Sequence, residues 1–421
     1  MGRETTYRRK GTNLPAMGDY NCSVVLEAIR EHDDISRIEI SRMTGLTAQT
    51  VTNIVRKLID QGLVYEQGIV TGRRGKPRTS IRLNEAGRFA IGVHIDPART
   101  TIVLIDLCGR IIDRIHPDMP EESSDAVQII AREIERMIEV NRIPEERLGG
   151  VGIAVPGPID IANEVVLDPP NLPGWRDVPV TQMLNAALHM PVLMEKDATA
   201  ACHGEAWSNI GVRGGDFLMV YVGLGIAFGV VKDGEVQRGM SGNEGEIGHI
   251  VVDLDGPQCW CGQHGCIAVT CDPRSIVNEA ERLGLFTKPT GVAPSKEFND
   301  SADLRSVLLH FDELRARACD GEHDCDVLFR RVGHRLGRAV TILTDMFDME
   351  RVIGGGPYWQ SLERFYVDGI SDELRSRAVL RRLHDFSVES SSHGCDVAAI
   401  GAASAILDRA FTPRAASLML T

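Results

Sequence analysis

Four residues that are well suited to bind a metal ion lie close together near the middle of the chain. His249 precedes a glycine-rich turn in which Cys259, Cys261 and Cys266 fall within eight residues. Three thiols and one imidazole supply the four ligands that tetrahedral Zn²⁺ prefers. The alternative is a chance cluster of buried cysteines, but isolated buried cysteines do not need glycines between them. The spacing therefore predicts a structural zinc site.

A second candidate surface lies near the N-terminus, where a basic head precedes an acidic body. Residues 1–84 carry 14 Lys and Arg against 9 Asp and Glu, a balance of +5, whereas the remainder has a balance of −18. This asymmetry suggests that the head contacts a polyanion and the body does not. Taken alone, an excess of five charges is equally typical of a solvated surface.

Three short helices are predicted in this head. Apolar residues within 21–31 share one helical face, Ser36 can cap a helix over 37–44, and Thr47 can cap a third helix that ends near Gly62. A helix, a glycine-containing turn and a helix present the last helix to a major groove. The residues expected to contact DNA from it are Thr47, Gln49, Thr50, Asn53 and Arg56.

A basic wing is predicted after the third helix. Strands are expected over 63–66 and 79–83, around an extended turn that suits a minor groove. Its basic residues are Arg73, Arg74, Lys76 and Arg78. The alternative is a helical cluster that packs on the body beside a solvated loop. The order of the elements together with their charge favours a winged helix-turn-helix that binds double-stranded DNA.

From Phe89 onward the pattern is that of a two-lobed α/β body. Buried strands are predicted at 90–96, 101–106, 108–112 and 149–155, and a second strand–turn–strand unit at 216–222 and 225–231. Helices are predicted over 124–141, most of 321–348, 359–376 and 396–410. Two similar openings, each followed by helices, indicate a duplicated architecture with a cleft between the lobes.

The predicted division has three parts. Residues 1–84 form the winged helix-turn-helix domain, and residues 85–203 form the first lobe, completed by a C-terminal helix at about 390–421. Residues 204–389 form the second lobe, with the zinc-binding segment and an oligomerisation surface. We find no apolar stretch long enough for a membrane helix and no secretory signal. Ten cysteines without an export signal suggest reduced thiols and a cytoplasmic location.

The motifs taken together resemble the ROK family (repressors, unannotated frames and sugar kinases), in particular its repressor branch of the xylose and N-acetylglucosamine type. The similarity runs from about Tyr20 to Phe411 and includes V-P-G-P-I-D, P-N-L-P-G-W, G-E-I-G-H and C-x-C-G-x-x-G-C-I. The last two motifs in combination are very specific. The resemblance implies an actin-like ATPase (ribonuclease-H-like) pair of lobes, with a sugar site beside the zinc ligands.

The resemblance also implies which residues bind the effector. Asp197 aligns with the catalytic aspartate of the family, a general base in kinases that can simply bind a sugar hydroxyl in a repressor. Glu246 and His249 are three apart, and the second ring nitrogen of His249 can bind a hydroxyl. Asn171 and Lys196 complete the predicted site. The alternative for Asp197 and Glu246 is a pair of solvated surface carboxylates.

Departures from the kinase pattern predict that ATP binding is lost. Family kinases open with Asp-x-Gly-Gly-Thr, whose glycines let backbone N–H groups approach phosphates. This chain has Asp96-Pro97-Ala98-Arg99-Thr100 instead. Its second loop is Gly223-Leu224-Gly225 where the family kinases have Gly-Thr-Gly, so a hydroxyl is lost. We therefore expect no catalytic residue, with Asp197 as a vestigial base.

Two departures concern the effector itself. Lys196 replaces an Asn and Ala268 replaces a Glu that usually contact sugar hydroxyls in the family. An unmodified hexose is therefore a less secure effector. If Lys196 points into the cleft it favours an anionic sugar derivative, although a lysine that extends to solvent fits equally well.

The sequence thus predicts a cytoplasmic, sugar-responsive transcriptional repressor that binds a DNA operator as a homodimer or homotetramer, without membrane contact. Two alternatives stay open. One is an active sugar kinase with a DNA-binding head, and the other is a metalloregulator that senses zinc. Four protein ligands with no open position favour a structural over a sensory ion.

Overall fold

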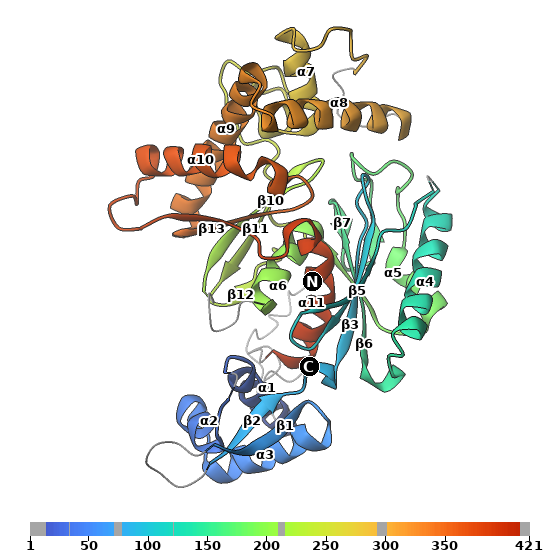
Figure 1. Cartoon of the computed structure of the whole chain (residues 1–421), viewed down its shortest axis with the longest axis vertical. Coiled ribbons are helices and arrows are strands. Elements are labelled where there is room, and N and C mark those ends of the chain that lie inside the picture. Colours follow the sequence, from blue (N-terminus) through green and yellow to red (C-terminus); the bar gives the residue numbers. More distant parts are fainter. Residues whose placement is uncertain are drawn as a thin grey trace, which may run out of the picture.

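The structure, a computed structural model, describes residues 14–32, 34–70, 78–120, 122–208, 215–292 and 301–412. Figure 1 shows a small head at one end of the molecule and two larger α/β lobes beyond it. None of the helices in these ranges combines the length and the apolarity that a bilayer crossing demands.

The head contains three helices and a two-stranded sheet. Its elements are α1 (Leu14–Arg30), α2 (Arg37–Thr44), α3 (Ala48–Asp60), β1 (Val64–Val70) and the antiparallel β2 (Arg78–Leu83). Local sequence fixes the starts of two helices, because Ser36 and Glu39 form a reciprocal capping box for α2 and the Thr47 side chain caps α3. The predicted winged helix-turn-helix is confirmed, although α1 begins earlier than expected.

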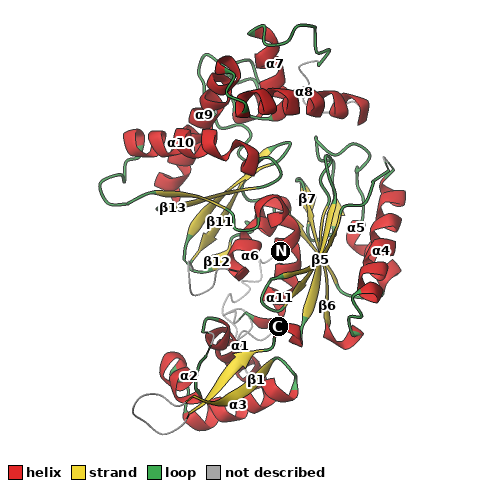
Figure 2. Cartoon of the chain, viewed as in Figure 1, coloured by secondary structure: helices red, strands yellow, loops and turns green. Residues whose placement is uncertain are grey.

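The first lobe is built on a five-stranded sheet with the order β5-β4-β3-β6-β9. The strands are β3 (Phe89–His94), β4 (Thr101–Asp106), β5 (Ile111–Ile115), β6 (Leu148–Val155) and β9 (Val192–Lys196). Strands β3, β4 and β5 are antiparallel neighbours, and β6 and β9 are added in parallel. Figure 2 shows α4 (Ser123–Val140) and α5 (Val180–Leu188) on the outer face of this sheet.

One strand starts later than predicted. The sequence analysis placed a strand at 108–112, but the Asp106 carboxylate accepts hydrogen bonds from the backbone N–H groups of Cys108 and Arg110. This side chain closes a tight turn, so that β5 begins only at Ile111.

The second lobe repeats the topology of the first. Its sheet has the order β12-β11-β10-β13-β14, again with three antiparallel strands followed by two parallel ones. The strands are β10 (Phe217–Val222), β11 (Ile226–Lys232), β12 (Glu235–Val236), β13 (Arg351–Gly355) and β14 (Ser387–Ser390), and the helices are α7 (Pro273–Arg282), α8 (Ser301–Cys319), α9 (His323–Phe347) and α10 (Trp359–Arg377). The predicted duplication, an actin-like pair of ribonuclease-H-like lobes, is confirmed.

Two small-residue helices fill the space between the sheets. These are α6 (Asp197–Ser208) and α11 (Val397–Phe411), whose backbones are in contact. A Cβ on Gly401 of α11 would lie 1.6 Å from the carbonyl oxygen of Ala200 in α6. On its other side α11 packs directly on β3, where a Cβ on Gly92 would lie 1.9 Å from the Ala399 carbonyl oxygen. The two helices and the first sheet therefore form one close-packed unit.

The head shares an apolar core with the first lobe. Leu26 and Ile29 of α1 belong to the same buried cluster as Ile400 and Leu407 of α11 and Trp207 of α6. Because this cluster is continuous, displacing α11 or α6 changes the surface on which the head rests.

Candidate functional site

A cavity of about 240 Å³ lies between the two lobes. The first lobe contributes residues from the ends of its parallel strands, and the second lobe contributes the segment that holds the cysteine cluster. All five residues predicted to bind an effector line this one cavity: Asn171, Lys196, Asp197, Glu246 and His249. Residues distant in the sequence thus meet at the carboxyl ends of the strands, where open α/β sheets bind ligands.

Lys196 is buried and forms an ion pair inside the cavity. Its Nζ lies 2.7 Å from Glu246 Oε1 and donates to the Glu244 carbonyl at 3.2 Å. The side chain is 1% exposed, so it does not extend to solvent. Gly157 provides the space for this pair, because a Cβ there would lie 2.8 Å from Glu246 Oε1. The ammonium charge is therefore already balanced by a carboxylate.

Asp197 begins α6 at the edge of the same cavity. Its carboxylate accepts a hydrogen bond from the Ala198 backbone N–H at 2.7 Å. Burial raises the pKa of Asp197 to about 7, and the nearby Lys196 opposes that rise. Near neutral pH this carboxyl group can therefore either donate or accept a hydrogen bond with a sugar hydroxyl.

The Asp96 side chain is hydrogen-bonded to the backbone of its own loop. Asp96 Oδ1 accepts hydrogen bonds from the N–H groups of Ala98 at 2.8 Å and Arg99 at 3.3 Å. These N–H groups are then unavailable to a phosphate, and Pro97 has none to offer. In the second loop the Leu224 side chain lines the cavity in place of a hydroxyl. The first loop thus differs from a phosphate-binding loop in its hydrogen bonds as well as in sequence, and the second differs in its side chain.

The four candidate metal ligands converge on one point. His249 Nδ1 lies 3.4 Å from Cys259 Sγ, and the Sγ atoms of Cys261 and Cys266 are 3.7 Å apart. All four ligand atoms lie within 4.8 Å of one another. A tetrahedral zinc ion with bonds of about 2.3 Å to sulfur requires S–S separations of roughly 3.8 Å, so this donor set fits the ion.

A glycine makes the tight turn of this segment possible. Gly265 has a φ of 67°, and a Cβ there would lie 1.5 Å from the Asp253 carbonyl oxygen. Because His249 turns Nδ1 toward the thiols, Nε2 remains for another partner. His249 therefore joins the candidate metal site to the cavity.

In the head, α3 presents a polar face to solvent. Its apolar residues, including Val51 and Val55, are buried against the head core, whereas Gln49, Asn53 and Arg56 are exposed. Of the other predicted DNA contacts, Thr47 is exposed and Thr50 is half-buried. Arg73, Arg74 and Lys76 lie outside the described residues, and Arg78 is placed only as the first residue of β2. The described part of this surface is free to meet a duplex.

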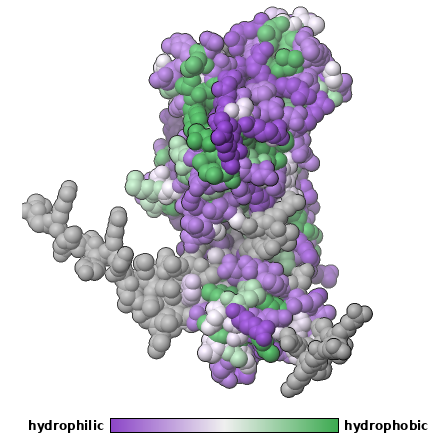
Figure 3. Space-filling model, turned by 90° about the vertical axis from the view of Figure 1, so that its left-hand side faces the viewer, coloured by the Kyte–Doolittle hydropathy of each residue, from purple (hydrophilic) through white to green (hydrophobic). Residues whose placement is uncertain are grey.

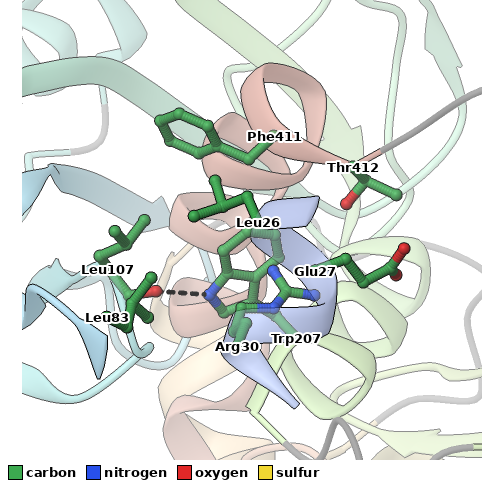
Figure 4. Close-up of a pocket in the computed structure, with 8 residues that line it drawn as sticks. All are labelled: Leu26, Glu27, Arg30, Leu83, Leu107, Trp207, Phe411 and Thr412. Carbon is green, nitrogen blue, oxygen red and sulfur yellow. Dashed lines mark hydrogen bonds between the residues drawn. The ribbon is translucent and has the colours of Figure 1, made fainter. Parts of the chain in front are cut away.

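A contact that the sequence did not reveal joins the head to the body. Figure 4 shows the guanidinium of Arg30, at the end of α1, stacked on the Trp207 ring, 3.5 Å from its centroid. Trp207 Nε1 donates to the Leu107 carbonyl at 3.3 Å. Burial lowers the pKa of Arg30 to about 10. Trp207 lies near the end of α6, the helix that begins with Asp197 at the cavity, so one helix spans the distance between cavity and head.

Other cavity residues were also missed. Trp260, Ile267 and Asp272 line the cavity beside the predicted residues. The position of Trp260 between two metal-ligand cysteines was the signal that could have found it. Asp272 offered no comparable signal.

The comparisons with known proteins agree with this architecture. Residues 90–409 match the model of the ROK family, and residues 19–75 match that of the MarR family. The chain is 26% identical to a xylose repressor of Bacillus spizizenii, over 92% of this chain and 95% of that protein. It is 32% identical to a glucokinase of Thermotoga maritima, over 63% of this chain and 81% of that protein.

A solved structure supports the fold over nearly the whole chain. A ROK family transcriptional regulator, a homologue of the Mlc protein of Escherichia coli, superposes with a TM-score of 0.74 at 22% identity. The alignment covers 94% of this chain and 98% of that one. Relatives of this chain thus include both repressors and sugar kinases.

Proposed function

Because this chain belongs to the ROK family and carries a helix-turn-helix head, we propose that it is a DNA-binding transcriptional repressor whose effector is a sugar. One observation carries the proposal: α3 exposes Gln49, Asn53 and Arg56 on a head that shares its core with the body containing the cavity. Amide and guanidinium groups of this kind contact base edges and phosphates in a major groove. In this proposal Thr47, Thr50 and the wing residues Arg73, Arg74, Lys76 and Arg78 add further contacts.

The effector binds in the cavity between the lobes. Asp197 and Glu246 accept hydrogen bonds from sugar hydroxyls, while Asn171, Lys196 and His249 Nε2 complete the polar lining. Ligand binding closes the lobes and displaces α6, which carries Asp197 at one end and Trp207 at the other. The stack of Trp207 on Arg30 passes this displacement to the head. An effector controls operator affinity in this way because it binds the two lobe arrangements with different affinity.

The proposal assigns no phosphoryl transfer to the chain. It is supported by the Asp96 turn, in which the backbone N–H groups of Ala98 and Arg99 are already bonded, and by Leu224 in the second loop. Because one relative of the chain is a glucokinase, an active sugar kinase is the second candidate function. Incubation with ATP and a panel of sugars, compared with Asp197→Asn, distinguishes the two functions, since only a kinase loses sugar-dependent ATP turnover in the variant.

We propose that His249, Cys259, Cys261 and Cys266 hold a structural zinc ion. When bound, the ion supplies no chemistry beyond fixing these four ligands. His249 connects the two sites, because it is one of the four metal ligands and also lines the cavity. A zinc-sensing regulator is less well supported, because the four protein ligands leave no open position.

The chain is proposed to act in the cytoplasm as a homodimer or homotetramer, with the domain division predicted from the sequence. Figure 3 shows apolar groups gathered on the upper part of one face, which the second lobe forms. Exposed apolar residues of that lobe include Ile342 and Met346 of α9, and Val379 lies beside them because its backbone N–H donates to Asp345. Such a patch is typical of an interface between subunits.

The experiment that tests the proposed function measures DNA binding and sugar binding on the same protein. Genomic fragments bound by the purified protein are selected and sequenced, and the duplex obtained is titrated by fluorescence anisotropy with and without sugars that raise the melting temperature. We expect a stabilising sugar to change operator affinity. A double variant, Gln49→Ala with Asn53→Ala, should lose the operator while keeping the thermal shift with sugar. Sugar binding without any effect on DNA affinity would refute the coupling.

A further inference from the structure

The cavity between the lobes is lined by two groups of residues of different chemistry. Asp197 lies within electrostatic range of Lys196, Glu246 and Asp96, and these four residues are called the polar end. The metal segment contributes Trp260, Ile267 and Ala268, which are called the apolar end, beside His249 and Asp272. Ala268 is fixed there because its backbone N–H donates to the Gly248 carbonyl at 2.9 Å. A ligand that fills the whole cavity therefore meets both charged groups and apolar groups.

Trp260 is the aromatic residue of the apolar end. It is 45% exposed, whereas the other three tryptophans of the chain, Trp175, Trp207 and Trp359, are at most 4% exposed. Its ring packs edge-on against His249, with 5.8 Å between the ring centroids. The two neighbouring cysteines belong to the candidate metal site, so the ring is held on a short and well-defined turn. A large apolar ring left open in a cavity wall marks a contact with a ligand.

The cavity wall at Gly248 and Ala268 carries no long side chain. Ala268 ends at its Cβ, which lies 3.5 Å from a Cβ built on Gly248. Neither residue offers a polar side-chain group to a sugar hydroxyl. The apolar end is thus better suited to a hydrocarbon or aromatic group than to a bare polyol.

We propose that the effector is a glycoside, with its sugar ring at the polar end and its apolar aglycone or second ring against Trp260. This inference rests on the proposed function, because it assumes that the cavity binds a carbohydrate. Trp260 is then the residue that distinguishes a glycoside from the free sugar. The ion pair of Lys196 with Glu246 fits the same ligand, because a balanced pair binds neutral hydroxyls without requiring an anion.

Titration of the full-length protein tests this assignment. The probes are D-xylose, D-glucose, D-galactose and D-mannose, each compared with its phenyl β-glycoside, by calorimetry and by tryptophan fluorescence. Because Trp207 on α6 can also respond to the ligand, a change in emission is assigned to Trp260 only where it is lost in Trp260→Phe. We expect one phenyl glycoside to bind on the order of tenfold more tightly than its parent sugar, as contact with an aromatic ring provides.

Variants at the same position separate stacking from a structural role. Trp260→Ala should abolish the preference for the glycoside, by lowering affinity for the glycoside far more than affinity for the parent sugar, and Trp260→Phe should retain most of the preference. Trp260→Leu keeps apolar bulk without an aromatic face, and bound metal measured in each variant shows whether the turn is intact.

The outcomes distinguish the inference from the function on which it rests. A parent sugar that binds as tightly as its glycoside, or a preference that survives Trp260→Ala, would overturn the glycoside assignment and leave the sugar-responsive repressor standing. If no sugar and no glycoside produces heat or a change in emission, both the assignment and the sugar effector are wrong.

Discussion

Replacing Gly401 by alanine should strongly destabilise the protein. The new Cβ would lie 1.6 Å from the carbonyl oxygen and 2.3 Å from the carbonyl carbon of Ala200. Both atoms belong to the backbone of α6, so no side-chain rotation relieves the clash. α6 and α11 must therefore separate, and α11 is in turn packed on the backbone of the first sheet. Overpacking of a core costs about 1–3 kcal/mol and occasionally more, and this contact falls at the upper end.

The helix propensity of alanine opposes this cost only slightly. Alanine is favoured over glycine in a helix interior by about 1 kcal/mol, which leaves a net loss of roughly 2 kcal/mol or more in the free energy of unfolding. Two matched glycine-to-alanine substitutions serve as controls for the size of this loss in stability. Gly204→Ala in α6 places its Cβ 2.9 Å from the Val397 carbonyl oxygen and should cost less. Gly18→Ala in α1 has no atom within 4 Å and should stabilise the protein.

Urea unfolding followed by circular dichroism measures all three variants. The expected order of midpoints is Gly18→Ala above the wild type, then Gly204→Ala, then Gly401→Ala. In the anisotropy titration, the Gly401→Ala protein should show weakened coupling between a stabilising sugar and DNA affinity, because α6 connects the two sites. A midpoint for Gly401→Ala equal to that of the wild type, or above that of Gly204→Ala, would refute the idea that the two helices form one close-packed unit.

Three further predictions follow from the sites. Arg56→Ala should weaken binding to duplex DNA and lower the salt dependence of log K by about one unit, whereas Arg282→Ala on the body should change neither in an anisotropy titration. Cys261→Ser should lower the bound zinc and the urea midpoint, and Cys319→Ser, an exposed thiol outside the cluster, should leave both unchanged when metal is measured by mass spectrometry. Because burial raises the pKa of Asp197 to about 7, the folded protein retains a proton that the unfolded chain releases near pH 4, and stability falls as pH rises through 7. The stability advantage of Asp197→Asn should therefore grow between pH 4 and 8, by at most about 4 kcal/mol, and a constant difference in urea unfolding would contradict this.

The sequence by itself determined the features that depend on neighbours within a few residues. Ser36 with Glu39, and Thr47 with Thr50, fix the helix starts of the head through hydrogen bonds across a single turn. The metal-ligand cysteines are likewise brought together by one short turn, so their spacing was sufficient to predict the cluster. The repeated pattern of apolar strands was enough to indicate two related lobes.

Only the tertiary structure decided which distant residues meet. The pairing of Lys196 with Glu246, and the stacking of Arg30 on Trp207, depend on how lobes and head pack together, and no local pattern encodes either contact. The start of β5 was misjudged although its cause is local, because the Asp106 side chain bonds backbone N–H groups two and four residues ahead that were expected to join a sheet. Apolar periodicity tells which face of an element is buried, whereas the partner on that face is selected by shape and charge over the whole fold.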